Sequence, residues 1–313
     1  MINYLKINNV KVVEMRQSMI YILRKIHGSS NLFRRWWFWI QFIKKNRYLP
    51  DFKNPKTYNE KVNYRKNNPK HELFSICSDK IVAKEWVAER IGEEYIVPNY
   101  FIGDLITPVK IKEILAEKGD CFLKANHNSG PVYLLTKDMS GFEIEMACND
   151  VNQQLSVDYG KLSNEPWYSA IKPRILVEKR LEPEDGEESI RDYKFHAFRQ
   201  EDGTFKIILE VHFDQGINPT ISYFDQDLNW IPITIEYPNI VTKIKKPINY
   251  EVMLEKAKEL AIEFTYVRVD FYNISGRIYY GELTFAKTSG SAIFMHKMYD
   301  LWMGNFWEGD PSY

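Results

Sequence analysis

The sequence predicts an α+β fold with mostly antiparallel strand pairing, and three observations support this prediction. Several segments place apolar residues at helical spacing. Two long strand-like segments, 191–200 and 204–213, flank a three-residue loop that ends in Gly203. A further hairpin lies within 266–285, and the sequence contains no internal repeat. Helices and antiparallel hairpins arranged in this way are typical of the α+β class.

The expected elements follow in order along the chain. Residues 1–50 alternate between apolar and basic and suit one or two helices. A helix is expected to begin near Thr57, which has capping-box spacing with Glu60. The remaining elements are a helix at 78–92, an extended segment around Pro98, a helix near 110–118, a strand–loop–strand unit at 120–136, a helix at 142–155, a buried strand at 173–183 and an amphipathic helix at 250–264.

Composition and charge are those of an ordinary globular protein. The 313 residues include 42 Lys and Arg against 42 Asp and Glu, so the chain lacks the basic surplus that a nucleic-acid partner requires. Three cysteines with neither CxxC nor Cys/His ligand spacing indicate no disulfide framework and no structural zinc. We therefore predict a cytoplasmic protein with no nucleic-acid partner.

An aromatic and basic cluster lies near the N-terminal end. The run WWFWIQFI at 36–43 is far shorter than the roughly 18 residues that span a bilayer, and no secretory signal precedes it. With the basic residues around it, this cluster could lie on an anionic membrane surface. It could equally pack on the rest of the protein, which is the commoner role of Trp. The first interpretation predicts peripheral contact of residues 16–48 with the inner membrane surface.

The hairpin within 266–285 places two carboxylates close together. If 275–277 form its loop, then 274 pairs with 278, 272 with 280, and Asp270 lies directly opposite Glu282. A two-residue loop at 275–276 would instead pair Val269 with Glu282. The first register gathers the apolar side chains on one face and the polar ones on the other, so we prefer it.

Directly opposed carboxylates repel each other unless one is protonated or a cation lies between them. Mg²⁺ is a hard cation that takes oxygen ligands, with water and phosphate in its remaining positions. Alternatively, Arg268 or a distant Lys neutralises Asp270 and Glu282 on a solvated face. Spacing alone leaves both interpretations open.

Other charged residues on the expected strands have ordinary interpretations as well. Lys124 lies in an apolar strand and could be a snorkelling surface residue. It could also bind phosphate together with the adjoining loop, whose backbone N–H groups suit an anion and whose residues are His127, Asn128, Ser129 and Gly130. Glu178 and Lys194 could each be a simple exposed strand charge.

The order of these segments resembles the TupA-like branch of the ATP-grasp superfamily over about residues 50–295. The segments that carry the resemblance are NPKTYNEKVNYRK, SDK with its helix and YIVPNY, FLKANHNSG, ILVEKRL, DYKFHAF, VRVDFY and GELTF…SG. The resemblance implies two α+β subdomains with antiparallel sheets that hold ATP between them, preceded by a helical N-terminal region. The expected division is a helical region at 1–78, a linker helix and pre-ATP region at 79–120, a small lid subdomain at 121–178 and a large subdomain with the metal site at 179–313.

The resemblance also implies site residues for ATP and Mg²⁺. Lys124 would contact the α- and β-phosphates, and the 127–130 loop would be the phosphate lid. Glu178 and the backbone from Lys179 to Leu181 would frame adenine and ribose. The terminal phosphate would be approached by Lys194, and the metal would be held by Asp270, Glu282 and Thr284, with Arg268 beside them. Relatives usually have Asn where this chain has Thr284, and their lids usually contain more glycines.

The implied activity is that of an ATP-dependent carboxylate–amine ligase, which forms an amide through an acylphosphate. Arg268 and Lys194 would stabilise the transferring phosphoryl group. The expected partners are a carboxylated sugar or amino acid acceptor and an amine donor, in the synthesis of a bacterial capsular or surface polysaccharide. One alternative is a glycosyltransferase that binds a metal–sugar-nucleotide through Asp225-x-Asp227. Another is an ATP-binding protein without turnover, which Thr284 suggests.

Overall fold

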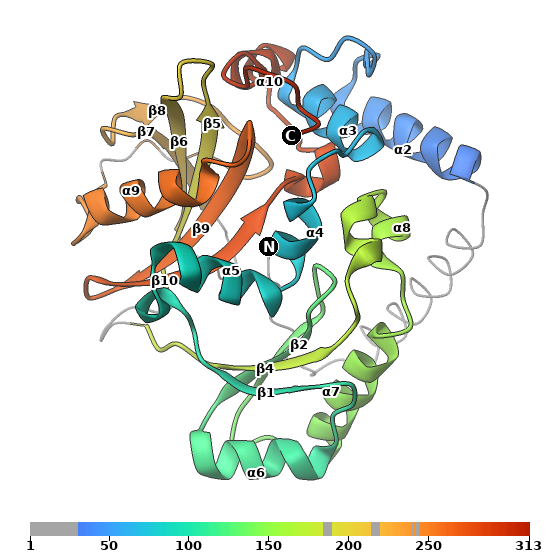
Figure 1. Ribbon diagram of the computed structural model, residues 1–313, viewed down its shortest axis with the longest axis vertical. Helices are drawn as coiled ribbons and strands as arrows, with labels where there is room; N and C mark the ends of the chain where they lie inside the picture. The colour runs from blue at the N-terminus through green and yellow to red at the C-terminus, as the bar shows by residue number, and fades with distance from the viewer. Residues whose placement is uncertain (1–30, 184–189, 214–219, 240, 242–243) are drawn as a thin grey trace. The chain divides into compact units, whose positions relative to one another are not determined.

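The computed structural model describes residues 31–183, 190–213, 220–239, 241 and 244–313, except for the side chains of 31–35 and 213. The chain divides into two compact units (Figure 1). Asp79–Val82 and Val97–Leu181 belong to the first, called here the small unit. Arg35–Ser78, Ala83–Ile96 and Glu182–Tyr313 form the second, the large unit. The four-part division expected from the sequence stays a prediction.

The small unit is built on a four-stranded antiparallel sheet in the order β1-β4-β2-β3. Its strands are β1 (Asn99–Gly103), β2 (Cys121–Ala125), β3 (Val132–Leu135) and β4 (Ile175–Lys179). Its helices are α6 (Pro108–Lys118), α7 (Gly141–Gln154), α8 (Tyr159–Ser163) and the 3₁₀ turn η2 (Pro166–Ala170). Alternate residues of β2 and β4, such as Leu123 and Val177, are buried against α6 and α7. The intervening residues Lys124 and Glu178 therefore lie on the other face of this sheet.

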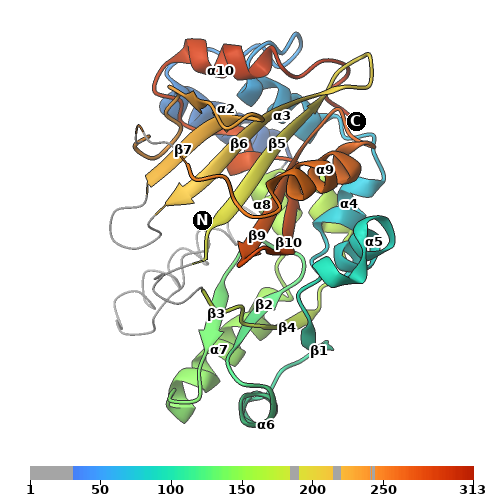
Figure 2. The same ribbon diagram turned by 90° about the vertical axis from the view of Figure 1, so that its left-hand side faces the viewer.

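The large unit is built on a six-stranded antiparallel sheet in the order β10-β9-β5-β6-β7-β8. Its strands are β5 (Asp192–Arg199), β6 (Phe205–Phe213), β7 (Thr220–Asp225), β8 (Trp230–Ile231), β9 (Tyr266–Ile274) and β10 (Arg277–Thr284). Helix α9 (Tyr250–Ala261) packs on β5 and β9 through buried residues such as Met253 and Leu260 (Figure 2). The remaining elements are α2 (Asn31–Asn46), α3 (Tyr58–Asn67), α4 (Leu73–Ser78), α5 (Val82–Ile91), η1 (Glu93–Tyr95), η3 (Lys287–Gly290) and α10 (Lys297–Gly304).

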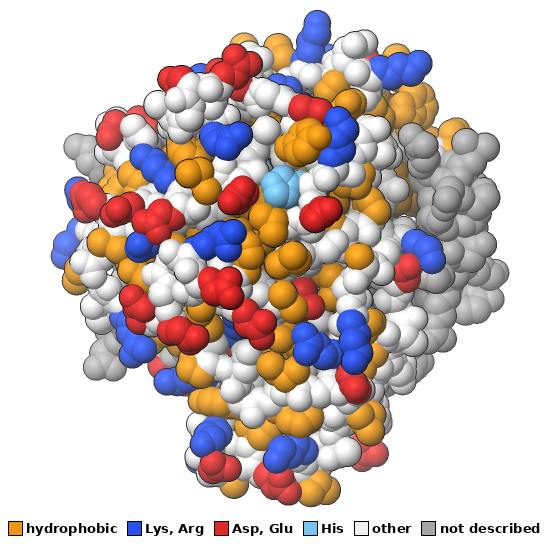
Figure 3. Space-filling view, in the orientation of Figure 1, with side chains coloured by type: hydrophobic (Ala, Val, Ile, Leu, Met, Phe, Trp, Pro, Cys, Tyr) orange, Lys and Arg blue, Asp and Glu red, His pale blue; other side chains and the backbone are white. Residues whose placement is uncertain are grey.

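Two antiparallel sheets with helices confirm the predicted α+β class. The loop between β5 and β6 is the expected one, because Gln200 N–H donates to Thr204 O at 2.8 Å and Gly203 has φ +84°. The helix expected between a cap at Ser78 or Asp79 and an end at Gly92 is confirmed as α5, which begins at Val82, and Asp79 Oδ1 accepts from Ile81 N–H at 2.9 Å. Acidic and basic side chains are interspersed on the face shown in Figure 3, as expected for a chain with 42 of each.

The predicted register of the β9–β10 hairpin is wrong near its loop and correct at the two carboxylates. Its loop has two residues, Ser275 and Gly276, both with positive φ, and Ile274 pairs with Arg277 rather than with 278. The register then shifts by one residue at Gly281, so that Asp270 lies opposite Glu282 as predicted. A Cβ at Gly281 would lie 3.1 Å from Asp270 O, so a larger residue at the bulge would require a shift of a few tenths of an ångström there. The predicted three-residue loop was therefore wrong, whereas the pairing of the two carboxylates was confirmed.

Helix α3 is buried and ties the first part of the large unit to its last part. Its capping box is confirmed, because Thr57 Oγ1 accepts from Glu60 N–H at 3.2 Å and Glu60 Oε2 accepts from Thr57 N–H at 2.9 Å. Asp300 on α10 accepts hydrogen bonds from Asn59 N–H at 2.9 Å and from the Tyr48 hydroxyl at 2.7 Å. Among the described residues no Lys, Arg or His forms an ion pair with Asp300, so its ionised form would be costly.

The stability of the protein is expected to depend on the protonation of Asp300. Burial raises its pKa from 3.8 to about 6, although hydrogen bonds from Asn59 and Tyr48 oppose the rise. A raised pKa means that the folded state holds the proton more tightly, so this contribution is present below pH 3.8 and is lost as the pH rises to about 6. Relative to Asp300→Asn, the free energy of unfolding should fall by roughly 2–3 kcal/mol across that window. Urea unfolding of the wild type and of Asp300→Asn at several pH values tests this. The same pH dependence of the free energy of unfolding in both proteins would contradict it.

Candidate functional site

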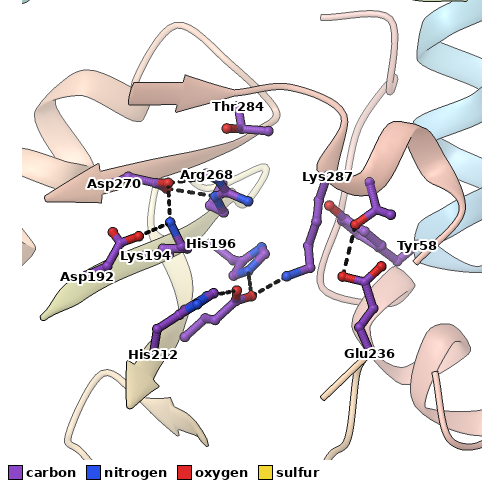
Figure 4. A network of polar contacts seen from close by, with 12 residues as sticks. Tyr58, Asp192, Lys194, His196, His212, Glu236, Arg268, Asp270, Thr284 and Lys287 are labelled. Carbon is purple, nitrogen blue, oxygen red and sulfur yellow. Dashed lines mark hydrogen bonds and ion pairs between the residues drawn. The ribbon is translucent and has the colours of Figure 1, made fainter. Parts of the chain in front are cut away.

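One face of the large sheet carries a row of charged side chains. In register across β10, β9, β5 and β6, the residues directly opposite one another are Glu282, Asp270, Lys194 and Glu210. The opposite face is apolar and buried, with Val269, Phe195 and Leu209 in neighbouring positions. Because side chains alternate along each strand, the polar residues share one face, which is called here the polar face (Figure 4).

Arg268 links the two opposed carboxylates. Its Nη2 donates to Asp270 Oδ2 at 2.6 Å and to Glu282 Oε1 at 2.8 Å, and its Nε donates to Asp270 Oδ1 at 2.7 Å. The Thr284 hydroxyl donates to Glu282 Oε1 at 3.2 Å. Arg268 therefore supplies the positive charge between Asp270 and Glu282, as the alternative interpretation of the hairpin expected.

Lys194 adds a second cation on the same face. Its Nζ donates to Asp270 Oδ2 at 2.8 Å and also contacts Asp192 Oδ2. Burial raises the pKa of Asp270, but the charges of Arg268 and Lys194 outweigh burial and bring that pKa down to about 2. Burial lowers the pKa of Lys194, but Asp192 and Asp270 reverse the effect and hold it above its ordinary value. Lys194 and Asp270 are therefore both charged at neutral pH.

The side chains expected to hold Mg²⁺ fit the ion in kind. Asp270, Glu282 and Thr284 offer carboxylate and hydroxyl oxygens on neighbouring positions of two strands, and these are ligands that Mg²⁺ prefers. The Glu282 side chain is 48% exposed, so it is open to a ligand from solvent. Among the described residues, no group of three or more His, Cys, Asp and Glu could hold a metal ion. Part of the ligand set would therefore have to come from nucleotide oxygens and water.

A second cluster surrounds Glu210, which is 1% exposed. Its Oε2 accepts from Lys287 Nζ at 2.5 Å and lies 3.0 Å from His196 Nε2, and its Oε1 lies 2.7 Å from His212 Nε2. Burial raises the pKa of Glu210, but Lys287 and the two imidazoles outweigh burial and hold that pKa well below its ordinary value. Glu210 is therefore a fixed negative charge on the polar face.

His196 joins Glu210 to a pair of buried tyrosines. Burial lowers the pKa of His196 to about 4, so the ring is neutral at pH 7. Its Nε2 faces the Glu210 carboxylate and must carry the proton, which leaves Nδ1 to accept from the Tyr266 hydroxyl at 2.9 Å. The Tyr266 oxygen lies 2.7 Å from the Tyr58 hydroxyl. Through His196, this chain of hydrogen bonds from Tyr58 and Tyr266 fixes the orientation of the Glu210 carboxylate.

In the small unit, Lys124 and Glu178 form an ion pair. Lys124 Nζ lies 2.9 Å from Glu178 Oε1, and both side chains are largely buried at 15% and 13% exposure. Two residues expected to recognise nucleotide thus neutralise each other on the face of the sheet opposite α6 and α7.

Hydrogen bonds within the 127–130 loop and to Val157 hold this loop in place. His127 is buried, and its Nε2 lies 3.1 Å from Val157 O. Asn128 is also buried, and its Oδ1 accepts from Gly130 N–H at 3.3 Å. Ser129 is exposed and Gly130 is half-buried, so these two are the more accessible part of the expected phosphate lid.

The segment expected to frame adenine is the end of β4. Lys179 N–H donates to Pro98 O at 3.0 Å, and its side chain is exposed. Leu181 follows and is half-buried. The backbone N–H of Lys179 is therefore already used within the small unit.

The Asp225-x-Asp227 motif forms a turn. Asp225 Oδ1 accepts from Asp227 N–H at 2.9 Å and from Asn229 N–H at 2.8 Å, and its Oδ2 accepts from Asn229 Nδ2 at 2.9 Å. A carboxylate used in this way stabilises the turn after β7. This geometry gives the motif a structural role.

A sequence model of the family described as TupA-like ATPgrasp matches residues 60–308. The chain belongs to the TupA-like ATP-grasp family. The match confirms the family and fold class expected from the sequence, and it includes both sheets and every residue of the expected site. Among curated proteins, none matches this TupA-like chain.

Solved structures that resemble this TupA-like ATP-grasp chain do so at low identity. D-alanyl-alanine synthetase A from Vibrio cholerae O1 biovar eltor str. N16961 is 17% identical with a TM-score of 0.42, over 66% of this chain and 55% of its own. D-Alanine-D-Alanine Ligase from Helicobacter pylori is 12% identical with a TM-score of 0.43, over 78% and 60%. ATP-grasp ligase PsnB, complexed with minimal precursor, Mg, and ADP, is 12% identical with a TM-score of 0.36, over 69% and 52%. The chain thus spans a little over half the length of these proteins, and such scores support no argument about activity.

Within the TupA-like ATP-grasp chain, the structure brings one group of expected site residues together. Arg268, Lys194, Asp270, Glu282 and Thr284 share the polar face of the large sheet. The expected residues of the small unit form a separate group around the Lys124–Glu178 pair and the 127–130 loop. Their roles in binding ATP and metal stay predictions.

Sequence reasoning missed Glu210, His212 and Lys287. The signal for the first two was present, because the three-residue loop at 201–203 pairs 194 with 210 and 192 with 212. A Glu and a His two residues apart on a mostly apolar strand should have been placed beside Lys194. Lys287 lies in η3, beyond the hairpin, and only the tertiary fold brings it to β6.

Proposed function

We propose that this TupA-like ATP-grasp chain is an ATP-dependent ligase that joins a carboxylate to an amine through an acylphosphate. The observation that supports this most is the arrangement of Arg268 and Lys194 around Asp270 and Glu282 on one sheet face. Phosphoryl transfer depends on positioned cations and metal ions that offset charge on the transferring group. Two buried cations, held in place by carboxylates, provide such positive charge without rearrangement.

The polar face would contribute both the metal site and the catalytic cations. We assign Mg²⁺ binding to Asp270, Glu282 and Thr284. The metal, when bound to phosphate oxygens, would supply charge neutralisation. Arg268 and Lys194 would interact with the transferring phosphoryl group, because each carries hydrogen-bond donors and a permanent charge at neutral pH.

The small unit would contribute nucleotide contacts. We assign the α- and β-phosphates to Lys124 and the lid to Ser129 and Gly130, with His127 and Asn128 holding the loop in shape. Adenine and ribose are assigned to Glu178 and the backbone of Lys179 to Leu181. In this proposal the Lys124–Glu178 ion pair separates when nucleotide binds, so that each side chain takes its own ligand.

The substrates would be a carboxylated sugar or amino acid and an amine. This substrate class is proposed from the family to which the chain belongs. The branch to which the chain belongs suggests a surface or capsular polysaccharide as the final product. The acceptor would then be a uronic acid or an amino acid attached to that polymer.

ADP release tests the proposed activity directly. Amino acids and amines crossed with uronic acids and their nucleotides, in the presence of ATP and Mg²⁺, should include a pair that raises ADP release above the rate with ATP alone. Both the carboxylate and the amine should be required for amide formation. Absence of ADP release with every pair, while ATP still binds, would favour the binding protein without turnover.

Nucleotide preference separates the proposed ligase from the glycosyltransferase alternative. We expect ATP with Mg²⁺ to raise the melting temperature, because a ligand that binds only the folded state stabilises it. A UDP-sugar with Mg²⁺ should leave it unchanged, since Asp225 is occupied by its turn. Stabilisation by the UDP-sugar alone would reverse this assignment.

Peripheral membrane contact through residues 16–48 is a separate proposal. Residues 16–30 lie outside the described residues. In α2, Trp36 is 56% exposed and Trp37 and Trp39 are each 38% exposed, while Phe42 is buried against Tyr48 and Phe52. No helix within the described parts of the chain is long and apolar enough to cross a membrane. Co-sedimentation with anionic liposomes tests the proposal, and binding that survives deletion of 1–48 would remove it.

A further inference from the structure

Asp192 and His212 face each other on the polar face, next to Lys194 and Glu210. The register of β5 and β6 places them directly opposite one another, and Figure 4 shows both on the side of the sheet that carries Lys194. Directly opposed residues have Cβ atoms about 4.5–5.5 Å apart. The Asp192 side chain is 13% exposed and that of His212 is 18% exposed, so solvent reaches part of each side chain.

Each of the two residues has a polar atom that the protein does not use. Asp192 Oδ2 contacts Lys194, but Oδ1 is buried and has no hydrogen-bond partner in the described structure. His212 Nε2 is engaged by Glu210, while among the described residues no hydrogen bond reaches its Nδ1. An unpaired buried carboxylate oxygen is unfavourable, so a donor from a ligand would remove a real cost here.

The Glu210 cluster controls the state of the His212 ring. Glu210 Oε1 lies 2.7 Å from Nε2, so Nε2 donates to this carboxylate, and the lone pair of the neutral ring then lies on Nδ1. Lys287 and His196 hold the other oxygen of Glu210. Among the described residues, the charged groups beside His212 are Glu210 on its own strand and Asp192 on β5, whereas Ile221 is its partner on β7. An imidazole that a carboxylate orients in this way is suited to accept a proton.

We propose that Asp192 and His212 form the site that binds and deprotonates the amine substrate. Asp192 binds the ammonium group of a primary amine, and Nδ1 of His212 takes one of its protons. This inference rests on the ligase function proposed above and assigns the site of its second substrate. The recognised class is a primary ammonium, because both free acceptor atoms need N–H donors and the carboxylate offsets one positive charge.

The chemical step balances as follows. One proton moves from the ammonium to His212 Nδ1, and the amine lone pair attacks the acyl carbon of the acylphosphate. The new C–N bond forms, the bond from the acyl carbon to the phosphate oxygen breaks, and inorganic phosphate leaves. The second proton on nitrogen goes to the departing phosphate, and the imidazolium, stabilised by Glu210, returns its proton to solvent. No oxidant or further reactant is needed.

His212→Gln tests the proton-accepting role. The glutamine amide reaches the position of Nε2 and still donates to Glu210, but it has no basic nitrogen. Hydroxylamine is the probe, because it is largely neutral at pH 7 and attacks acylphosphates without a base. With the carboxylate found by ADP release, we expect His212→Gln to form the hydroxamate within about twofold of the wild type and to form amide from a primary ammonium about 10²–10⁴-fold more slowly. The residual amide rate should rise with pH as more amine is uncharged.

Two further variants sharpen the result. Asp192→Asn should raise the KM for the ammonium substrate by a larger factor than it slows hydroxylamine trapping, since it removes the charge that binds the cation while Asp270 still pairs with Lys194. His296→Gln changes an exposed histidine of the same unit and should affect neither reaction. Long-range ¹H–¹⁵N spectra of the wild type should show His212 with the proton on Nε2.

The following outcomes would contradict the proposal. Equal losses in both reactions would make His212 structural, and no loss in either would remove its role. A His212 ring protonated on Nδ1 at pH 7 would also overturn it. If the wild type releases no ADP with any carboxylate, the ligase function fails and this proposal with it. An active wild type with an unaffected His212→Gln leaves the ligase function intact and overturns only the amine site.

Discussion

Asp270→Asn is expected to lower ATP turnover at least about 100-fold, the scale seen when a preorganised charge at a transferring group is removed. Asp270 is 3% exposed and accepts from Arg268 and Lys194, so it holds in place both cations that we propose to be catalytic. Its removal would change the proposed metal ligand and the positions of these cations together. ADP release at saturating ATP, measured over a range of Mg²⁺ concentrations, gives both the rate and the metal dependence.

The same variant should also be less stable. Loss of one partner from a buried ion pair leaves uncompensated charge, at a cost of about 3–5 kcal/mol. Glu282→Gln is the matched control, because the Glu282 side chain is 48% exposed and pairs with the same Arg268. It should weaken Mg²⁺ dependence with a much smaller change in melting temperature. Wild-type turnover in Asp270→Asn would show that the metal assignment is wrong.

The pH dependence of stability is expected to differ between Asp270 and Asp300. Its pKa in the folded protein is about 2, below the ordinary value of 3.8. A depressed pKa means that its contribution is present above the ordinary value and is lost only as the pH falls toward 2. The difference in stability between wild type and Asp270→Asn should therefore be constant from pH 5 to 8, in contrast with that of Asp300→Asn.

The opposed carboxylates could be predicted from the sequence, whereas the turn beside them could not. Alternation of apolar and polar residues fixes which side chains share a face, and this was enough to pair Asp270 with Glu282. A two-residue loop followed by a bulge at Gly281 restores the same pairing as a three-residue loop without a bulge. From Glu282 onward, both arrangements place the same side chains on the same face. The alternation of these residues therefore does not distinguish a two-residue loop from a three-residue loop.

The Glu210 cluster shows a different limit. The pairing of 194 with 210 follows by counting from the loop at 201–203, so Glu210 and His212 were within reach of the sequence. Lys287 was not, because its contact with Glu210 joins residues 77 positions apart through η3. Local patterns specify the face of each strand, but they do not specify which later segment covers that face.

Arg65→Met is expected to destabilise the large unit by about 3–5 kcal/mol, because it leaves buried carbonyls without donors while keeping much of the volume. The Arg65 side chain is fully buried. Its nitrogens donate to Pro311 O at 2.7 Å, Tyr266 O at 2.8 Å, Tyr313 O at 2.7 Å and Phe285 O at 3.3 Å. Burial lowers the pKa of Arg65 to about 9, although the neighbouring tyrosines oppose this, so the guanidinium remains charged at neutral pH.

Lys70→Met provides the control for Arg65→Met, since Lys70 also holds the 310–313 segment. Its ion pair with Asp310 is 2.9 Å long, but the two side chains are 50% and 41% exposed. An exposed pair contributes less than about 1 kcal/mol, so this variant should melt within a few degrees of the wild type. Urea unfolding of both variants measures the difference. A loss below about 1 kcal/mol in Arg65→Met would mean that water replaces the guanidinium at these carbonyls. Helix α3 would then be held to β9 mainly by the packing of Tyr58 on Tyr266 and to α10 by the Asn59–Asp300 hydrogen bonds.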